Sequence, residues 1–290
     1  MDFLNAETLL ECCRKQNIPI SGAMLARETS LGSCTKESVA ERLEKAVQIM
    51  RDASHDPIEN PKTSIGGLIG GEAQKVRRYA EANGSICGSS LTKAISYGMA
   101  VLEVNATMGL IVAAPTAGSA GVVPGVLLAL QEEYELSDET LERGLLNAGA
   151  IGYILMRNAS VSGAEAGCQA EVGAASAMAA GAAVEMLGGT PEMSFHAASL
   201  ALSNLLGLVC DPIAGLVEAP CQSRNAIGVA NAFTCAQLAL SGVTHPVPFD
   251  EMAEAMYKVG RTLPFELRET AMGGNAGTPT GCALNCGKCK

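Results

Sequence analysis

Three cysteines stand among small residues between positions 158 and 231: Cys168, Cys210 and Cys221. One proline lies two residues after Cys210 and another directly precedes Cys221, which predicts that both thiols sit on fixed turns rather than in the middle of a helix. The neighbouring glycines and alanines let backbone segments approach closely. Three thiols on short, stiff segments could hold a metal ion or a metal cluster. The alternative is that they are buried as small hydrophobic side chains, as free cysteine commonly is.

A polar, glycine-rich turn at residues 114–125 is a second candidate site, and it contains Thr116 and Ser119. A buried loop must find partners for its backbone polar groups. Backbone N–H groups that lead into a helix N-terminus bind carboxylates well, and the two hydroxyls would add donors. This turn is therefore a candidate carboxylate site, and an ordinary connection between two helices is the alternative.

Three ionisable side chains are candidates for contact with a bound group. Arg224 follows Cys221 closely enough to reach whatever the cysteines hold. Lys75 lies one turn into the helix that follows the glycine-rich segment 63–71, and it could point back toward an anion or remain a solvated surface residue. That segment is not a P-loop, because no Gly-Lys-Ser/Thr follows it. His196 lies inside a predicted helix, where a lone histidine is more often a core or surface residue than a catalyst.

The C-terminal tail is rich in glycine and ends in three further cysteines, Cys282, Cys286 and Cys289. Alone, they could suggest a zinc knuckle. Three thiols without a nearby histidine, however, leave a structural zinc site one ligand short. A free chain end is the alternative.

The composition excludes several classes of function. The chain has 290 residues and a formal net charge of −10 without a basic patch, which argues against nucleic-acid binding. Eleven cysteines and no secretory signal favour a cytoplasmic, metal-binding protein over one stapled by disulfides. The uncharged run 104–131 is long enough to raise the question of a membrane span. Its prolines and glycines favour two core helices joined by a loop, so we expect no membrane insertion.

The hydrophobic pattern predicts an all-α fold with almost no alternating strand pattern. Hydrophobic residues make up 48% of the chain and aromatic residues only 3%, so the core must be closely packed aliphatic side chains. We expect a helical break at His55-Asp-Pro57, and an N-terminal helical segment, 1–57, packed on or docking against a main domain, 58–290. Helices are predicted over residues 6–16, 20–30, 36–53, 72–82, 138–156, 171–187, 191–208, 225–241 and 249–261.

Five long segments, in a fixed order, carry a family resemblance. They are Glu103–Gly109, Pro115–Gly125, Ser162–Gly173, Gly207–Cys221 and Leu267–Gly274. On these segments the chain closely resembles the α subunit of bacterial iron–sulfur-dependent L-serine dehydratase (L-serine ammonia-lyase). The resemblance covers about residues 60–280 and is weaker in the first 55 residues.

The resemblance implies a [4Fe-4S] cluster held by Cys168, Cys210 and Cys221, with the fourth iron open to substrate. Residues 58–290 would then be a helical iron–sulfur catalytic domain. The spacing of the ligands is unlike that of ferredoxins, which favours a catalytic cluster over one for electron transfer. The implied reaction removes water from L-serine and gives pyruvate and ammonia, as in cytoplasmic serine degradation and gluconeogenesis. The open iron would act as a Lewis acid on the hydroxyl.

The same resemblance implies L-serine as substrate and a separate β subunit as partner, in a homo- or hetero-oligomer. The general base stays open between Lys75, His196 and a group from the β subunit. The residues expected to bind substrate are Thr116, Ser119, Asn105 and Arg224.

In some members of the family a cysteine near the C-terminus caps the open iron. Cys289 is the penultimate residue and the best candidate for this fourth ligand, with Cys286 and Cys282 behind it. A tail of this kind departs from the pattern expected for the α subunit of a two-chain enzyme.

Two other functions fit the same cysteines. An L-cysteine desulfidase-like lyase would expel sulfide instead of hydroxide, and a product assay separates the two. A non-catalytic iron–sulfur sensor would keep the cysteines but need no polar loop at 116–119, and serine would not perturb its spectrum. A pyridoxal phosphate dehydratase could perform the overall reaction, but the sequence offers neither α/β alternation nor a persuasive Schiff-base lysine.

Overall fold

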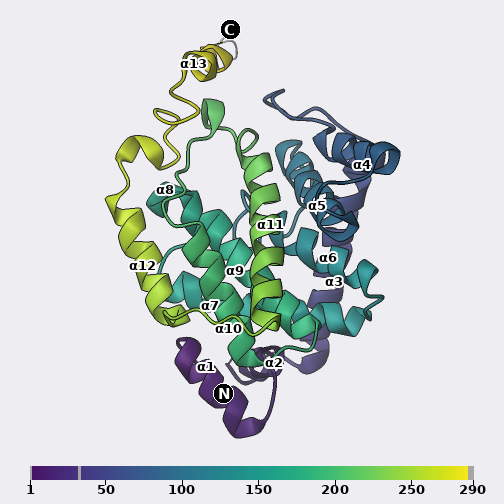
Figure 1. Cartoon of the computed structure of the whole chain (residues 1–290), viewed down its shortest axis with the longest axis vertical. Coiled ribbons are helices and arrows are strands. Elements are labelled where there is room, and N and C mark those ends of the chain that lie inside the picture. The colour runs from purple at the N-terminus through teal and green to yellow at the C-terminus, as the bar shows by residue number, and fades with distance from the viewer. Residues whose placement is uncertain (1, 32–33, 287–290) are drawn as a thin grey trace.

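The computed structural model describes residues 2–31 and 34–286, and the regular structure of this part of the chain is almost entirely α-helical (Figure 1). Its other regular structure is limited to two short 3₁₀ turns, at Ile213–Gly215 and Phe265–Leu267, and one isolated parallel bridge between Cys210 and Arg268. The all-α prediction is confirmed. The helices are α1 (Ala6–Gln16), α2 (Ile20–Leu31), α3 (Lys36–Glu59), α4 (Glu72–Asn83), α5 (Ser89–Ala106), α6 (Val122–Glu133), α7 (Asp138–Asn158), α8 (Gly163–Ala166), α9 (Cys168–Met186), α10 (Pro191–Asn204), α11 (Cys221–Leu240), α12 (Phe249–Thr262) and α13 (Pro279–Cys286).

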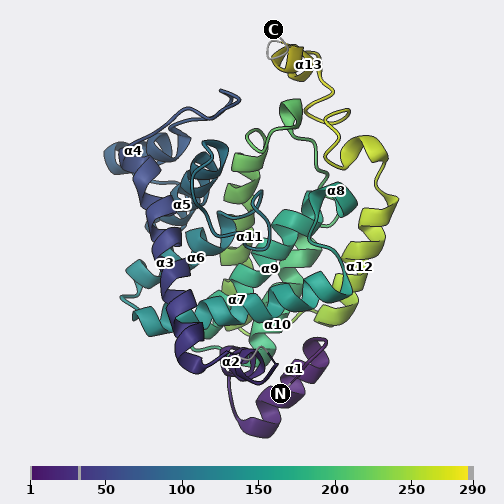
Figure 2. The ribbon, with the colours of Figure 1, turned by 180° about the vertical axis from the view of Figure 1, so that it is seen from behind.

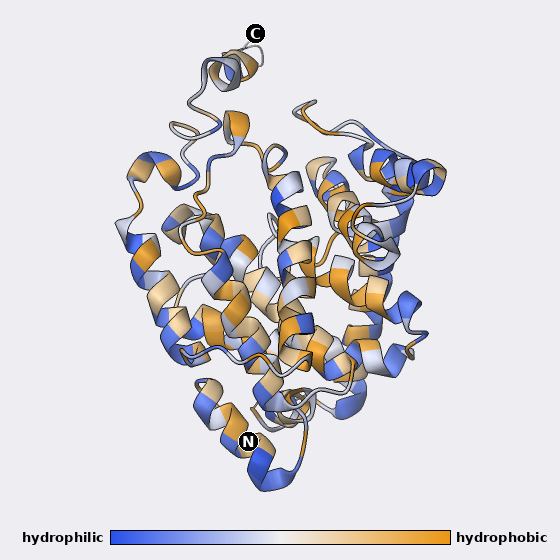
Figure 3. Cartoon of the chain, in the orientation of Figure 1, coloured by the Kyte–Doolittle hydropathy of each residue, from blue (hydrophilic) through white to orange (hydrophobic). Residues whose placement is uncertain are grey.

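The core is built around α9, which packs against α6, α7, α10 and α11. All of its residues are buried except Glu171 and Glu185, because other helices cover it on every side. In Figure 2, which views the molecule from the opposite side, α7 crosses in front of α9 and α3 runs along the side. The sequence of α9 is mostly alanine and glycine, and α6 and α9 are largely apolar where the outer helices show polar faces (Figure 3). Small side chains therefore let the surrounding helices pack closely on a central one.

Close backbone contact joins α5 to α6. A Cβ on Gly121 would lie 2.0 Å from the carbonyl oxygen of Gly98, and one on Gly125 would lie 2.8 Å from that of Ala94. The uncharged run 104–131 is thus the end of α5, a loop and α6, as predicted. Among the described residues there is no helix whose length and apolarity would let it cross a bilayer. The glycine contacts fix where α6 begins and hence where the preceding loop lies.

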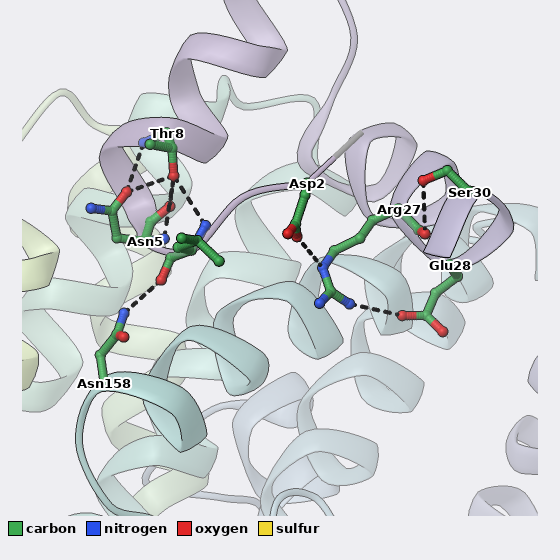
Figure 4. A network of polar contacts seen from close by, with 8 residues as sticks. Asp2, Asn5, Thr8, Arg27, Glu28, Ser30 and Asn158 are labelled. Carbon is green, nitrogen blue, oxygen red and sulfur yellow. Dashed lines mark hydrogen bonds and ion pairs between the residues drawn. The ribbon is translucent and has the colours of Figure 1, made fainter. Parts of the chain in front are cut away.

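The N-terminal residues are fastened to α7 by an aromatic contact and by polar contacts, and Figure 4 shows the polar ones. The guanidinium carbon of Arg27 lies 3.9 Å from the ring centroid of Tyr153, and its Nε lies 3.2 Å from Asp2. The amide of Asn158, at the end of α7, donates to the carbonyl of Leu4 at 2.7 Å. The division of the chain at residues 57 and 58 stays a prediction.

The predicted break at His55-Asp56-Pro57 is wrong, because α3 continues to Glu59. Pro57 lies in the last turn of the helix, where its missing N–H costs a single backbone hydrogen bond. The amide of Gln74 in α4 donates to the carbonyl of Ile58 at 2.7 Å and so supplies a partner for the helix end.

Candidate metal centre

The three predicted cysteine ligands gather where α9 and α11 begin. Cys168 is the first residue of α9, Cys221 is the first of α11, and Cys210 lies in the extended segment between α10 and α11. The prediction that Cys210 and Cys221 avoid helix interiors is confirmed. Both helices start earlier than predicted, because Gly167 and Pro220 supply the turns that precede them. The positive ends of the two helix dipoles favour negative charge on these thiols.

Cys168, Cys210 and Glu171 form the tightest group of ligand atoms. Their Sγ and carboxylate oxygen atoms all lie within 4.8 Å of one another. A Cβ on Gly163 would lie 3.0 Å from Sγ of Cys210, so a larger residue at this position would crowd the thiol. Sequence reasoning missed Glu171, although its spacing of three residues from Cys168 places both on one face of α9. Cys221 is not a member of this group of three.

A C-terminal segment closes over Cys210. The backbone N–H of Cys210 donates to the carbonyl of Leu267 at 2.9 Å, and Glu269 N–H donates to the carbonyl of Cys210 at 2.7 Å. Glu269 adopts a φ of +63°, which is uncommon for a residue other than glycine. Its carboxylate would lie 3.4 Å from a Cβ on Gly163, so a second acidic side chain faces the thiols.

Arg224 brings a buried positive charge to the site. Its Nη1 donates to the carbonyl of Val209 at 2.7 Å and to Sγ of Cys168 at 3.5 Å. Its Nη2 lies 2.6 Å from the carboxylate of Asp211, which is 2% exposed. Asp211 also accepts from the backbone and side-chain nitrogens of Asn275, at 2.6 and 2.9 Å. The arginine therefore links Cys168 to the C-terminal segment.

These contacts set the ionisation of the site. The Cys210 thiol donates to Cys168 and lowers the pKa of Cys168; burial opposes this and Arg224 reinforces it. The pKa of Cys210 is raised by the same hydrogen bond and by burial. Burial, followed by the negative charge of Cys168, raises the pKa of Cys221. Burial also raises the pKa of Glu171, and Glu269 adds to this effect. Of these three thiols in the metal-free chain, Cys168 is therefore the one that ionises first.

The predicted carboxylate loop lies beside the thiols. The Thr116 hydroxyl donates to Glu171 and lies 3.0 Å from the hydroxyl of Ser119, which is fully buried. Asn225, one turn after Cys221, holds the loop in place. Its amide nitrogen donates to the carbonyl of Gly118 at 2.8 Å, and its oxygen accepts from Gly121 N–H at 3.1 Å. Thr116 and Ser119 are thus next to the acidic edge of the cysteine group.

Three predicted residues lie elsewhere in the fold. Asn105 is in the last turn of α5, and its carbonyl accepts from Met108 N–H. The side chain of Lys75 is 72% exposed and pairs with Glu72 at 3.1 Å. His196 lines a cavity of about 690 Å³ between α1, α10 and α12, where its Nδ1 accepts from the backbone N–H of His245. Neither Lys75 nor His196 is brought against the cysteines.

The cysteines of the tail are described only in part. Cys282 is exposed on α13, and its thiol lies 3.5 Å from the carbonyl of Ala276. Cys286 is the last residue of α13. Cys289, the predicted fourth ligand, lies outside the described residues.

The donor set fits a metal cofactor. Cys168, Cys210 and Cys221 are free thiols that are 1%, 2% and 5% exposed, and a carboxylate and a guanidinium accompany them. Soft thiolates suit iron–sulfur clusters and zinc, and a nearby cation favours the thiolate form. Cys168, Glu171 and Cys210 could form a metal site by themselves.

Most of the chain matches known serine dehydratase alpha chains. A family model described as "Serine dehydratase alpha chain" matches residues 15–276. The chain is 49% identical over 282 residues to the "Probable L-serine dehydratase, alpha chain" of Bacillus subtilis (strain 168), a match that covers 97% of this chain and 94% of the relative. It is 45% identical over 276 residues to the "L-serine dehydratase, alpha chain" of Peptoniphilus asaccharolyticus, covering 95% and 94%.

A longer relative matches over part of its length. The "L-serine dehydratase" of Haemophilus influenzae is 38% identical over 282 residues, which is 94% of this chain but 61% of the relative. About two fifths of that protein therefore lies outside the match.

Proposed function

The chain belongs to the serine dehydratase alpha chain family, and from this premise we propose that it is the α chain of an L-serine dehydratase with a [4Fe-4S] cluster. The reaction would remove water from L-serine and give pyruvate and ammonia. The observation that carries the proposal is the close pairing of two buried, unbridged thiols from distant parts of the sequence, Cys168 and Cys210. Arg224 donates to Cys168, and the buried thiol of Cys221 begins α11.

Cys168, Cys210 and Cys221 would hold the cluster, with Cys289 as a candidate fourth ligand. When bound, such a cluster supplies a Lewis acid that makes the serine hydroxyl a better leaving group. Arg224 stabilises negative charge at Cys168 and is itself held by Asp211, so we propose that it orients the ligand set. Charge-assisted contacts of this kind are stronger than neutral hydrogen bonds.

The loop at residues 114–121 would bind the substrate carboxylate. It leads into the N-terminus of α6, where the helix dipole favours an anion. Thr116 and Ser119 supply hydroxyls, and Asn225 keeps the loop rigid. We include Asn105 and Arg224 as further candidate substrate contacts.

Two acidic side chains suit the rest of the substrate. Glu171 and Glu269 supply counter-charge for the ammonium group and a proton acceptor for the α-hydrogen. Burial raises the pKa of Glu171, which makes its carboxylate a stronger base. The last step needs no further residue, because the aminoacrylate that is released after loss of water hydrolyses spontaneously to pyruvate and ammonia.

A second chain would complete the enzyme. Two relatives are named as alpha chains, and a longer relative extends well beyond the matched part. We therefore propose a separate β chain as partner. The thiol-rich composition suits the reducing cytoplasm, where we propose that the protein acts.

Anaerobic reconstitution with iron and sulfide tests the proposal. The wild-type chain should bind both, its absorption spectrum should change when L-serine is added, and pyruvate should form with the β chain present. Alanine at Cys168, Cys210 or Cys221 should abolish iron binding. Cys235→Ala is the matched control, because Cys235 is a buried thiol of α11 that contacts Asn204 and Asn231 instead.

Other results would redirect the assignment. A wild-type chain that binds no iron would disprove the ligand assignment. A chain that binds iron but neither responds to serine nor forms pyruvate would be a sensor rather than a lyase.

A further inference from the structure

The glycine-rich segment 63–71 has no part in the proposed chemistry, yet the structure holds it tightly. Its backbone closes on itself, because Ser64 N–H donates to the carbonyl of Ile69 at 2.9 Å. Gly70 has a φ of +156°, and a Cβ there would lie 2.9 Å from the carbonyl oxygen of Lys62. Only glycine fits this position. The segment is therefore shaped for a specific contact.

Glu218 is the group around which the segment closes. One carboxylate oxygen accepts from Gly66 N–H at 2.6 Å, and the other accepts from the Ser64 hydroxyl at 2.7 Å and Leu68 N–H at 2.9 Å. Glu218 is 2% exposed. A buried carboxylate is costly unless hydrogen bonds compensate its charge, and here three donors come from residues 64–68 alone.

A second buried carboxylate ties the other end of the segment to α11. Glu103 accepts from Gly71 N–H at 3.1 Å and from Ala73 N–H at 2.9 Å. It also accepts from the side-chain amide of Gln222 at 2.9 Å. Residues 64–73 are thus bonded to Glu218, which lies just before α11, and to Glu103, which contacts Gln222 in its first turn.

Cys221 lies between these two connections. Glu218 precedes it by three residues and Gln222 directly follows it. The backbone N–H of Gln222 donates to the carbonyl of Glu218 at 2.9 Å, which joins the first turn of the helix to the residues directly before it. The backbone of a helix fixes the direction of each Cα–Cβ bond. The backbone around Cys221 therefore sets where its sulfur lies.

We propose that Glu218 is a positioning residue for Cys221, and that the glycine-rich segment is the clamp through which it acts. The inference rests on the proposed function in that Cys221 is taken as a cluster ligand. Glu218 does not touch the thiol. It fixes the chain three residues earlier, and Gln222 and Glu103 fix the residue that follows.

Alkylation of the metal-free, full-length chain tests this placement directly. The native protein is treated with N-ethylmaleimide under anaerobic conditions, and the rate at each cysteine is measured by mass spectrometry. Cys221 is 5% exposed in the wild type and should react slowly. Glu218→Gln replaces an acceptor with an amide that faces N–H donors, so Cys221 should react at least about tenfold faster. Cys235, in the same helix, should keep its rate.

Three variants separate position from charge and from general loosening. Glu218→Asp keeps the charge but withdraws the carboxylate by one methylene, so it should release Cys221 as well. Ser64→Ala removes one donor and should raise the rate by about fivefold or less, which keeps the test available if Glu218→Gln does not fold. Glu132→Gln is the matched control, since Glu132 also has several partners, Lys93 and Tyr97 among them, on other elements.

The possible outcomes are distinct. An unchanged rate at Cys221 in Glu218→Gln and Glu218→Asp overturns the inference, and so does an equal rise at Cys235. Iron and sulfide binding by the wild type is measured separately. If the wild type binds no iron but Glu218→Gln selectively exposes Cys221, the cluster proposal fails and the role of Glu218 stands. If the wild type binds iron but the Glu218 variants leave the rate at Cys221 unchanged, the cluster proposal stands and the role of Glu218 fails.

Discussion

Nη1 of Arg224 lies 3.5 Å from Sγ of Cys168, and the same guanidinium lies 2.6 Å from Asp211. One buried cation therefore joins a thiol at the start of α9 to the carboxylate that holds Asn275 of the C-terminal segment. A change at either end of this chain of contacts should be measurable at the other.

Arg224→Met should raise the pKa of Cys168 in the metal-free chain. The hydrogen bond from Cys210 remains, but the positive charge that helps to lower this pKa is removed. The pH dependence of Cys168 alkylation should shift to higher pH, and the reaction should be slower at neutral pH. Arg51→Met serves as the control, because Arg51 pairs with Asp138 on other helices. An unshifted profile would show that Arg224 does not act on this thiol.

Gly274→Ala should release the C-terminal segment from Asp211. A Cβ there would lie 2.1 Å from the Asp211 carboxylate, and φ is +59°. Gly207→Ala is the matched control, with φ of +84° and nothing within 4 Å of the added Cβ. Both variants should lose about 1 kcal/mol from backbone strain. Only Gly274→Ala should lose more in urea unfolding and expose residues 268–276 to protease. Equal losses of unfolding free energy in the two variants would mean that Asp211 moves away from the added Cβ without destabilising the protein.

Gly121→Ala should destabilise the contact between α5 and α6. The added Cβ would lie 2.0 Å from a backbone oxygen, so the helices must separate, at a cost of about 1–3 kcal/mol or more. Gly149→Ala in α7 meets only Met24 Cε at 3.9 Å, and it should stabilise by roughly 0.5–1 kcal/mol through higher helix propensity. Urea unfolding followed by circular dichroism measures both. Two variants of similar stability would contradict the close packing.

Glu171 should make the metal-free chain less stable as pH rises. Burial raises its pKa in the folded chain above the ordinary value of 4.5, so the folded state holds a proton that the unfolded state has lost. Stability should therefore fall as pH rises from about 4.5 through the raised pKa. Glu171→Gln should remove this part of the fall, as measured by Tm against pH.

Glu132→Gln should have the opposite effect on the same profile. Burial acts to raise the pKa of Glu132, but hydrogen bonds from Lys93 and Tyr97 outweigh it and the pKa is lowered. The wild type gains stability from this group above pH 4.5 and loses it as pH falls through the folded pKa. The variant should lack that gain. If both variants change the profile in the same direction, the pKa values of Glu171 and Glu132 are not shifted in opposite directions.

Local sequence signals predicted the helices well. Asn5 caps α1, and its side chain accepts from Thr8 N–H. Thr35 and Thr190 likewise cap α3 and α10. The break expected at Pro57 failed because the proline lies in the last turn of α3, and Gln74 from another helix pairs with the carbonyl of Ile58 at the helix end. Such a contact depends on the tertiary fold and leaves no local trace.

Some residues of the site could likewise be predicted from local sequence, and others depend on the tertiary fold. Cys168, Cys210 and Cys221 stand in recognisable motifs, and the loop with Thr116 could be identified from its glycines. Other members depend on contacts between segments far apart in the chain. Asp211 meets Asn275 and Glu218 meets residues 64–68. A lone acidic residue in a motif does not reveal which distant backbone it will bind.

The pairing of Cys210 with Leu267 and Glu269 has a consequence for biosynthesis. Chains fold from the N-terminus as they are made, so Cys168, Cys210 and Cys221 leave the ribosome well before the segment that closes over Cys210. Until residue 269 has emerged, the nascent chain carries thiols that nothing from this segment covers. Loading of a metal cofactor into the closed pocket would then follow translation of residue 269, and products terminated before that residue would have these thiols exposed to oxidants.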